Sequence, residues 1–271
     1  MLITSVSNDD MEPIYRVDHA GQPIYALRRE GKWQALTGDI YGRFTAGAPL
    51  DLAEPRVLAP VIPSKIVAVG LNYKDHAAEM NKALPDEPLI FLKPSTAVIG
   101  PDAAIVIPPD AGRVDYEAEV GVVIGRNARN VSASKAHEYV LGLTCVNDVT
   151  DRDLQRRDVQ YTRAKGFDTF APLGPCVATA ALDKPIGVEL RVNGELRQSS
   201  STSELIFSIR RLVEFVTAVM TLLPGDIIST GTPPGVGPIV PGDRVVVTVE
   251  GVGELANNVV SSRDVSGGTD R

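Results

Sequence analysis

The sequence predicts a mixed, mainly-β fold of the α+β class with a few covering helices. Short apolar segments bounded by turn residues clearly outnumber segments with helical periodicity. These strands do not alternate regularly with helices, which argues against a doubly wound parallel sheet. A chain of 271 residues, 44% of them apolar, is long enough to bury one large core and to carry a small appendage.

The first 60 residues predict a small, β-rich N-terminal domain. Two strand segments, 14–17 and 23–27, flank the residues His19-Ala20-Gly21-Gln22, which indicate a hairpin turn. Several prolines near position 60 then mark a connector to a larger domain over 61–262. The polar, Gly-rich end, 263–271, is expected to be a disordered tail.

The larger domain opens with a short buried strand at 65–70, followed by a helix over Tyr73–Lys82. The segment Val131-Ser132-Ala133-Ser134 is expected to open another short helix with a serine as N-cap, and Ser201 to Glu204 fit a capping box before a helix at 205–221. Further strands are expected at 89–92, 105–107, 116–124, 141–147, 188–192, 226–230 and 244–249.

Composition excludes several classes of partner. A formal net charge of −7 argues against nucleic acid, although a bound cation would still allow an anionic substrate. The two cysteines, Cys145 and Cys176, form no CxxC pair and suit a reducing compartment. The N-terminus has no signal-peptide pattern, and charged residues interrupt the longest apolar stretch. We therefore expect a cytoplasmic protein with no membrane partner.

Three acidic residues are candidate metal ligands. Glu117 and Glu119 lie two apart at the head of an apolar strand, so their side chains should project from one face. Asp148 directly follows another buried strand. Three carboxylates with water suit Mg²⁺ or Mn²⁺, and no His or Cys lies beside them to favour zinc. From the residues alone, a solvated strand edge with salt-bridged acids remains an alternative.

His76 is the best candidate for a general base. It lies three residues before Glu79 on a predicted helix, so the two side chains share a face and the carboxylate can orient the imidazole. The other histidines are less suitable, because His19 falls in a turn and His137 in a solvent-facing helix. An ordinary surface ion pair remains the alternative for His76 and Glu79.

Seven segments resemble the fumarylacetoacetate hydrolase family in order and spacing, over about residues 60 to 260. The resemblance is to the single-domain acylpyruvase and 2-hydroxyhepta-2,4-diene-1,7-dioate isomerase-like members, and it implies a β-sandwich roll and usually a homodimer. The matching segments are Val69–His76, Phe91–Thr96, Val114–Glu119, Asn147–Gln155, Ala164–Phe170, Val192–Glu195 and Pro224–Pro233.

The resemblance also implies roles for individual residues. It implies that the helix of His76 and Glu79 is a lid that orders over bound substrate. It also implies that Glu117, Glu119 and Asp148 bind the metal. The residues that it places against the substrate are Lys165, Gln155 and Thr232. Leu71 stands where some members carry arginine, which leaves the identity of the substrate open.

These roles fit a metal-dependent hydrolase that cleaves a C–C bond in an acylpyruvate-type 2,4-dioxo acid. The metal would stabilise the enolate and His76 would activate water. Lys165 and Gln155 would stabilise the oxyanion by about 3–4 kcal/mol per donor. A Schiff base at Lys165 is a less favoured reading. Arg152 is a candidate substrate contact, or the partner of Asp153 in a supporting ion pair.

Other reactions of a small 2-oxo acid remain open. Oxaloacetate decarboxylation needs the metal enolate but no attacking water. Tautomerisation or isomerisation of a dienoic 2-oxo acid, as in aromatic catabolism, needs only proton transfer. A metal-stabilised scaffold without enzymatic activity is the non-catalytic alternative. The loop of Gly231, Gly235 and Gly237 could present backbone N–H groups to a carboxylate, or could simply be a tight turn.

Overall fold

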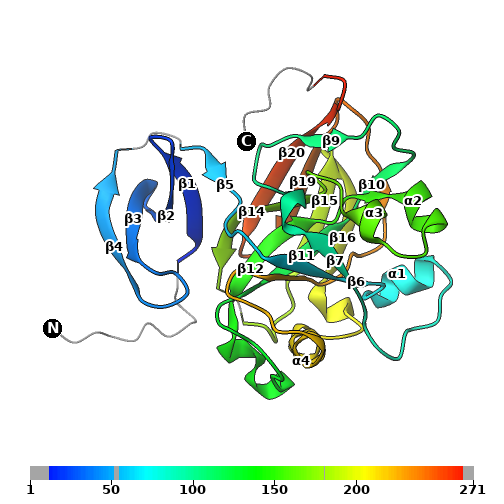
Figure 1. Ribbon diagram of the computed structural model, residues 1–271, viewed down its shortest axis with the longest axis horizontal. Coiled ribbons are helices and arrows are strands. Elements are labelled where there is room, and N and C mark those ends of the chain that lie inside the picture. The colour runs from blue at the N-terminus through cyan, green and yellow to red at the C-terminus, as the bar shows by residue number, and fades with distance from the viewer. Residues whose placement is uncertain (1–11, 52–54, 180, 265–271) are drawn as a thin grey trace.

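The computed structural model describes residues 12–51, 55–179 and 181–264, and its mainly-β fold agrees with the sequence prediction (Figure 1). Most of the tail expected to be disordered, residues 265–271, lies outside the described residues. None of the helices in the described ranges is long and apolar enough to cross a membrane.

The largest sheet has the strand order β4-β3-β2-β1-β14-β12-β11-β17-β6-β7, with β5 and β8 paired beside it. Its strands are β1 (Ile14–His19), β2 (Gln22–Arg29), β3 (Lys32–Gly38), β4 (Phe44–Leu50), β5 (Val57–Leu58), β6 (Lys65–Gly70), β7 (Leu89–Pro94), β8 (Val98–Ile99), β11 (Ala118–Ile124), β12 (Val140–Asn147), β14 (Ala171–Ala178) and β17 (Ile227–Ser229).

Two smaller sheets complete the fold. The first, in the order β13-β10-β18, consists of β10 (Val114–Tyr116), β13 (Thr150–Asp151) and β18 (Gly237–Pro238). The second, in the order β16-β15-β19-β20-β9, consists of β9 (Ile105–Ile107), β15 (Gly187–Val192), β16 (Glu195–Ser201), β19 (Arg244–Val249) and β20 (Gly253–Ser261). The α-helices are α1 (Lys74–Glu79), α2 (Arg152–Arg157), α3 (Thr162–Lys165) and α4 (Ile209–Val219).

Strands β1 to β4 form an antiparallel meander at the left of Figure 1. The predicted hairpin is confirmed, since His19 pairs with Gln22 across a turn whose two central residues, Ala20 and Gly21, both have positive φ. The meander joins the rest of the sheet where Ile14 pairs with Val177 of β14. The domain boundary near residue 60 stays a prediction.

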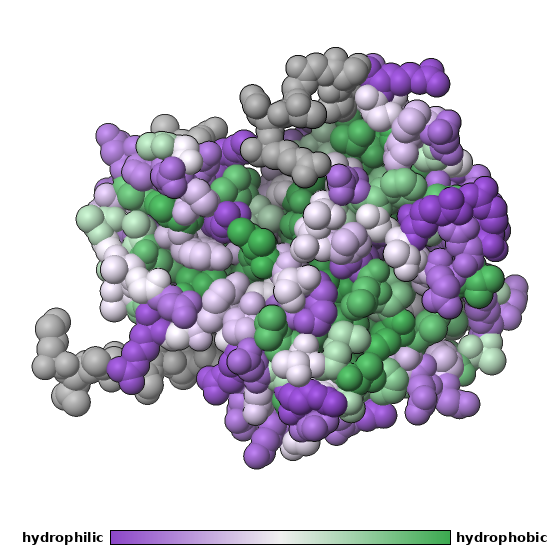
Figure 2. Space-filling model, viewed as in Figure 1, coloured by the Kyte–Doolittle hydropathy of each residue, from purple (hydrophilic) through white to green (hydrophobic). Residues whose placement is uncertain are grey.

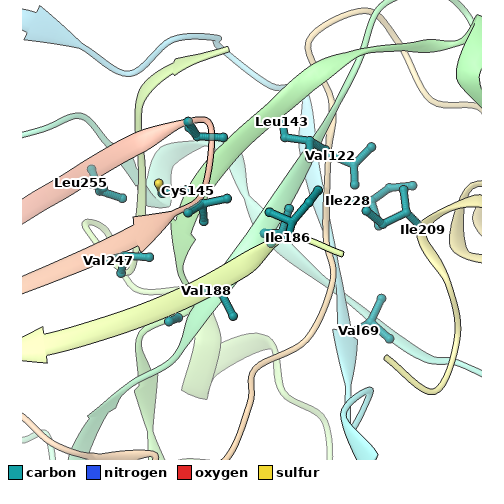
Figure 3. Close-up of a cluster of buried hydrophobic side chains, with 14 of the residues drawn as sticks. Val69, Val122, Leu143, Cys145, Ile186, Val188, Ile209, Ile228, Val247 and Leu255 are labelled. Atoms are coloured by element: carbon teal, nitrogen blue, oxygen red, sulfur yellow. The ribbon is translucent and has the colours of Figure 1, made fainter. Parts of the chain in front are cut away.

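The main core lies between the large sheet and the five-stranded sheet (Figure 3). Val122 and Ile228 of the large sheet belong to the same buried cluster as Val188 and Val247 of the smaller one, and Ile209 joins it from α4. Each is almost fully buried, which contributes about 1.5–3 kcal/mol per side chain. This packing holds β11 and β17 in place, and the acidic residues lie beside the ends of these strands.

The predicted capping box before the last helix is wrong. Helix α4 begins at Ile209 and is capped by Ser208, whose hydroxyl accepts from the backbone N–H of Arg211. Ser201 instead caps a short 3₁₀ turn over Thr202–Glu204. An antiparallel bridge between Leu205 and Tyr73 holds the chain extended after that turn and so delays the helix.

Helix α1 is shorter than the predicted 73–82, for a local reason. Asn81 adopts φ 53°, and the N–H of Lys82 donates to the carbonyl of Ala77, which is the hydrogen bond of a Schellman C-cap. Helix α1 therefore ends at Glu79, and this short helix carries His76.

Asp226 is a buried carboxylate just before β17 that ties its own turn to the start of β6. Its Oδ1 accepts from the backbone N–H and the hydroxyl of Ser64, at 2.9 and 2.7 Å. Its Oδ2 accepts from the Lys65 ammonium at 2.5 Å and from the N–H of Leu223 at 2.8 Å. Burial alone would raise the pKa of Asp226, but these donors outweigh burial and hold the pKa below its ordinary value.

We expect Asp226→Asn to lower the free energy of unfolding by about 3 kcal/mol at pH 7, because it leaves Lys65 without its buried partner. The folded pKa is depressed, so this stabilisation is present above the unfolded pKa of about 4 and is lost as the pH falls through the folded value. Urea unfolding of both proteins at pH 7 and pH 3 should show a smaller difference at pH 3. An undiminished difference would argue against this assignment.

Candidate active site

The three predicted acidic residues come together in one buried cluster. Glu117, Glu119 and Asp148 each place a carboxylate oxygen within 4.8 Å of the others. They converge because β11 pairs with β12 in a register that sets Ala118 opposite Asn147. A solvated strand edge, the alternative reading, is excluded since all three residues are at most 6% exposed.

The strand expected over 116–124 is interrupted at Glu117, but the predicted convergence of Glu117 and Glu119 is confirmed. Strand β10 ends at Tyr116 and β11 begins at Ala118. The Glu117 N–H donates to the Asn147 side chain at 3.0 Å, and its carbonyl accepts from the N–H of Asp148 at 2.9 Å. These contacts fix the backbone of Glu117 beside the end of β12.

Two buried lysines and an arginine surround the cluster. Lys165 Nζ donates to Glu117 Oε2 and to Asp148 Oδ2, at 2.6 Å each. Lys93 Nζ donates to Asp148 Oδ1 and, at 3.1 Å, to the carbonyl of Val149. Arg152 donates to Glu117 Oε1. Every oxygen of Glu117 and Asp148 thus has a cationic donor.

Lys93 is a site residue that the sequence analysis did not single out. It is fully buried in the edge strand β7. Its position within the apolar run Leu89–Pro94 was the available signal, but a lysine there also fits a half-exposed strand. Only the long-range contact with Asp148 identifies its role.

Glu119 differs from its neighbours. Its Oε2 accepts from the Ser229 hydroxyl and, at 2.9 Å, from the N–H of Gly231, but Oε1 is buried and no described residue donates to it. Gly231 can approach because it has no side chain, since a Cβ on it would lie 2.7 Å from that of Asn72. Burial, and then the charges of Asp148 and Glu117, raise the pKa of Glu119 well above its ordinary value.

The pKa values of Glu117 and Lys165 shift toward their ionised forms. Burial would raise the pKa of Glu117, but Lys165 and Arg152 lower it to about 2. Burial would lower the pKa of Lys165, but the charges of Asp148 and Glu117 outweigh burial and raise it. An all-oxygen set with one unpartnered carboxylate oxygen fits a hard divalent cation. Glu117, Glu119 and Asp148 would hold it.

The predicted ion pair between Arg152 and Asp153 is wrong. The two residues are adjacent on α2, and neighbouring helical side chains do not face each other. Arg152 instead donates to Asp115 at 2.8 Å and to Gln155 Oε1 at 2.7 Å, besides Glu117. Its guanidinium thereby fixes the Gln155 side chain, and contact of either residue with substrate remains a prediction.

His76 and Glu79 make the expected contact. His76 Nδ1 lies 2.8 Å from Glu79 Oε2, and Glu79 Oε1 accepts from the N–H of Gly235 at 3.2 Å. A proton on Nδ1, donated to Glu79, leaves Nε2 as the basic nitrogen. No hydrogen bond in the described ranges joins this pair directly to the carboxylates. The loop 229–235 links the two groups indirectly. Its Gly231 N–H donates to Glu119 of the cluster, and its Gly235 N–H donates to Glu79.

The hydroxyl of Thr232 has a partner within the fold. It donates to the carbonyl of Ala118 at 2.9 Å and accepts from Gln198 Nε2 at 2.8 Å. Gln198, a buried residue of β16, also accepts from the N–H of Ala118 and donates to the carbonyl of Pro233. Nothing in its strand segment indicated this role. The contact of Thr232 with substrate remains a prediction.

Helices α1, α2 and α3 lie together at the end of the molecule opposite β1 to β4 (Figure 1). Figure 2 shows hydrophilic side chains gathered over α2, where Arg156 and Arg157 are exposed. A polar surface thus lies beside the elements that carry Gln155 and Lys165.

A family model described as the C-terminal part of fumarylacetoacetate (FAA) hydrolase matches residues 65–260, which contain the whole cluster. The chain belongs to the fumarylacetoacetate hydrolase family. In this family the buried acidic group of Glu117, Glu119 and Asp148 is consistent with a typical divalent-metal site, and the substrate is a small molecule.

Several named relatives of this chain are isomerases and tautomerases. A solved structure of 5-carboxymethyl-2-hydroxymuconate delta-isomerase from Mycobacterium smegmatis is 44% identical, with a TM-score of 0.87, over 92% of this chain and 100% of that one. A 2-hydroxyhepta-2,4-diene-1,7-dioate isomerase from Mycobacterium marinum is 40% identical, with a TM-score of 0.86, over 93% and 99%. A mitochondrial oxaloacetate tautomerase of Bos taurus is 43% identical over 78% of this chain and 71% of its own.

Proposed function

We propose that this enzyme interconverts the enol and keto forms of a small 2-oxo dicarboxylic acid, with oxaloacetate or a dienoic analogue as substrate and Mg²⁺ or Mn²⁺ as cofactor. The observation that carries the proposal is the buried carboxylate cluster with an unpartnered oxygen on Glu119. The named relatives support proton transfer, since tautomerisation and isomerisation both pass through an enolate.

The chemistry needs a cation and a base. A divalent cation on the cluster would act as a Lewis acid that stabilises the enolate. His76 Nε2 takes the enol O–H proton and returns a proton to the adjacent carbon, so that the enol becomes the ketone without loss of atoms. Glu79 holds the imidazole in the required tautomer through Nδ1. In this proposal Lys165 and Gln155 would donate to substrate oxygens.

Charge favours a dianionic substrate. With Glu119 ionised, the four carboxylates of the cluster and its rim are balanced by four cationic side chains. The carboxylates are Asp115, Glu117, Glu119 and Asp148, and the cations are Lys93, Arg113, Arg152 and Lys165. A bound divalent cation adds two positive charges, which a dicarboxylate offsets in this buried site.

Hydrolysis of an acylpyruvate is a second candidate, and the His76–Glu79 pair favours it. An imidazole that is oriented by a carboxylate can activate water as well as move a substrate proton. Both reactions use the same enolate, and they differ in whether water reaches the distal carbonyl. The homodimer and cytoplasmic location expected from the sequence likewise remain predictions.

An activity panel tests the proposal. Chelator-treated enzyme reloaded with Mg²⁺ or Mn²⁺ is mixed with oxaloacetate, a dienoic 2-oxo acid and acetylpyruvate, and both enol absorbance and products are followed. We expect rapid loss of enol absorbance with oxaloacetate or the dienoic acid and no carbon–carbon cleavage. Cleavage of acetylpyruvate without enol–keto conversion of the other acids would support the hydrolase instead.

A further inference from the structure

We propose that the Lys165 ammonium takes the metal's place in the metal-free protein, so that Lys165 and a divalent cation compete for the same two carboxylate oxygens. The inference rests on the metal role given under the proposed function. It adds a second role for this lysine, in which metal binding releases it.

The inference rests on the hydrogen bonds accepted by the four carboxylate oxygens of Glu117 and Asp148. Glu117 Oε1 accepts from Arg152 and Asp148 Oδ1 accepts from Lys93. The remaining oxygens, Glu117 Oε2 and Asp148 Oδ2, both accept from Lys165 Nζ at 2.6 Å. Each oxygen keeps a second lone pair, but a cation that uses Glu117 and Asp148 as ligands is repelled by the positive charge already at those oxygens, so it competes with one of these three side chains.

Lys165 is the side chain that can leave most readily. Arg152 is also held by Asp115 and Gln155, and Lys93 is also held by the carbonyl of Val149. The two hydrogen bonds of the Lys165 ammonium both go to candidate metal ligands. A metal that takes those oxygens removes both acceptors at once.

A second contact is available to the displaced ammonium. Lys165 Nζ lies 5.1 Å from the centre of the Phe91 ring, which packs edge-on against Tyr161. An aromatic face stabilises a nearby ammonium. Once free of the carboxylates, Lys165 can donate to a substrate oxygen, so we infer that metal binds before substrate.

The test compares two buried lysines that both contact Asp148. Lys165→Met and Lys93→Met each remove one positive charge from the cluster, but only Lys165 competes directly with the metal. Chelator-treated proteins are titrated with Mn²⁺, and free Mn²⁺ is followed by electron paramagnetic resonance. We expect Lys165→Met to tighten Mn²⁺ binding by about tenfold or more, and Lys93→Met to leave it near the wild-type value or weaken it.

Thermal unfolding gives a second readout. Metal-free Lys165→Met should melt below the wild type, because two buried carboxylates lose their cation, and Mn²⁺ should raise its melting temperature more than that of the wild type. If the methionine variant does not fold, Lys165→Gln should shift the affinity in the same direction.

The possible outcomes distinguish failure of the Lys165 competition from failure of the proposed metal-dependent function. Equal tightening in both lysine variants would reflect general charge alone and would overturn the competition. Unchanged or weaker Mn²⁺ binding in the Lys165 variants would also overturn it. Failure of the wild type to bind Mn²⁺ or Mg²⁺ would instead overturn the proposed metal-dependent function.

Discussion

Glu119→Gln should abolish divalent-cation binding and lower turnover by at least about 10²-fold. The amide of Gln carries no negative charge to attract the cation. The carboxylates of Glu117 and Asp148 remain, but lysine and arginine side chains already neutralise them. Because burial and the neighbouring charges raise the pKa of Glu119, its protonated form resembles an amide in the metal-free protein. We therefore expect the fold to tolerate the substitution well.

Mn²⁺ titration, turnover and thermal unfolding of Glu119→Gln provide the measurement. The surface variant Glu195→Gln, at a side chain that is 71% exposed, is the matched control and should match the wild type. In the wild type, metal affinity should fall as the pH is lowered, because Glu119 must lose its proton to bind the cation. Turnover that persists in excess chelator would exclude a metal mechanism.

His76→Ala should lower enol–keto conversion by about 10²–10⁴-fold while leaving Mn²⁺ affinity unchanged. The base is lost, but no hydrogen bond joins His76 to the carboxylate cluster within the described residues. Glu79→Gln should have a smaller effect, since its amide oxygen can still accept from Nδ1. Acylpyruvate hydrolysis, if the enzyme performs it, should fall together with enol–keto conversion.

Oxaloacetate decarboxylation distinguishes the role of the base, His76, from the role of the metal. It requires the stabilised enolate but no attacking water, so His76→Ala should spare much of any such activity, whereas Glu119→Gln removes it. His137→Ala, which alters an exposed histidine that contacts Arg210, is the control. Equal loss of decarboxylation and enol–keto conversion in His76→Ala would contradict this division of roles.

The acidic cluster was predictable because its signals are local. Glu117 and Glu119 head an apolar strand, and Asp148 ends another. The interruption at Glu117 was not predictable, since it depends on the side chain of Asn147. The carboxylates still converge because the register of β11 and β12 brings the strand ends together.

Contacts between distant segments account for what the sequence analysis missed. Lys93 lies 55 positions from Asp148, and its strand segment reads equally well as half-exposed. Gln198 supports Ala118 from 80 positions away. The start of helix α4 depends on the bridge between Tyr73 and Leu205. Periodicity and capping patterns contain no information about such pairs.

Proton exchange at the carbon next to the 2-oxo group tests the central claim most directly. The enzyme is incubated with oxaloacetate in D₂O, and loss of the C3 proton signal is followed by NMR relative to a protein-free sample. We predict fast exchange with Mg²⁺ or Mn²⁺, and only the protein-free rate after chelation or in Glu119→Gln. Fast exchange that survives both chelator and Glu119→Gln would contradict enolate formation at a metal held by Glu117, Glu119 and Asp148.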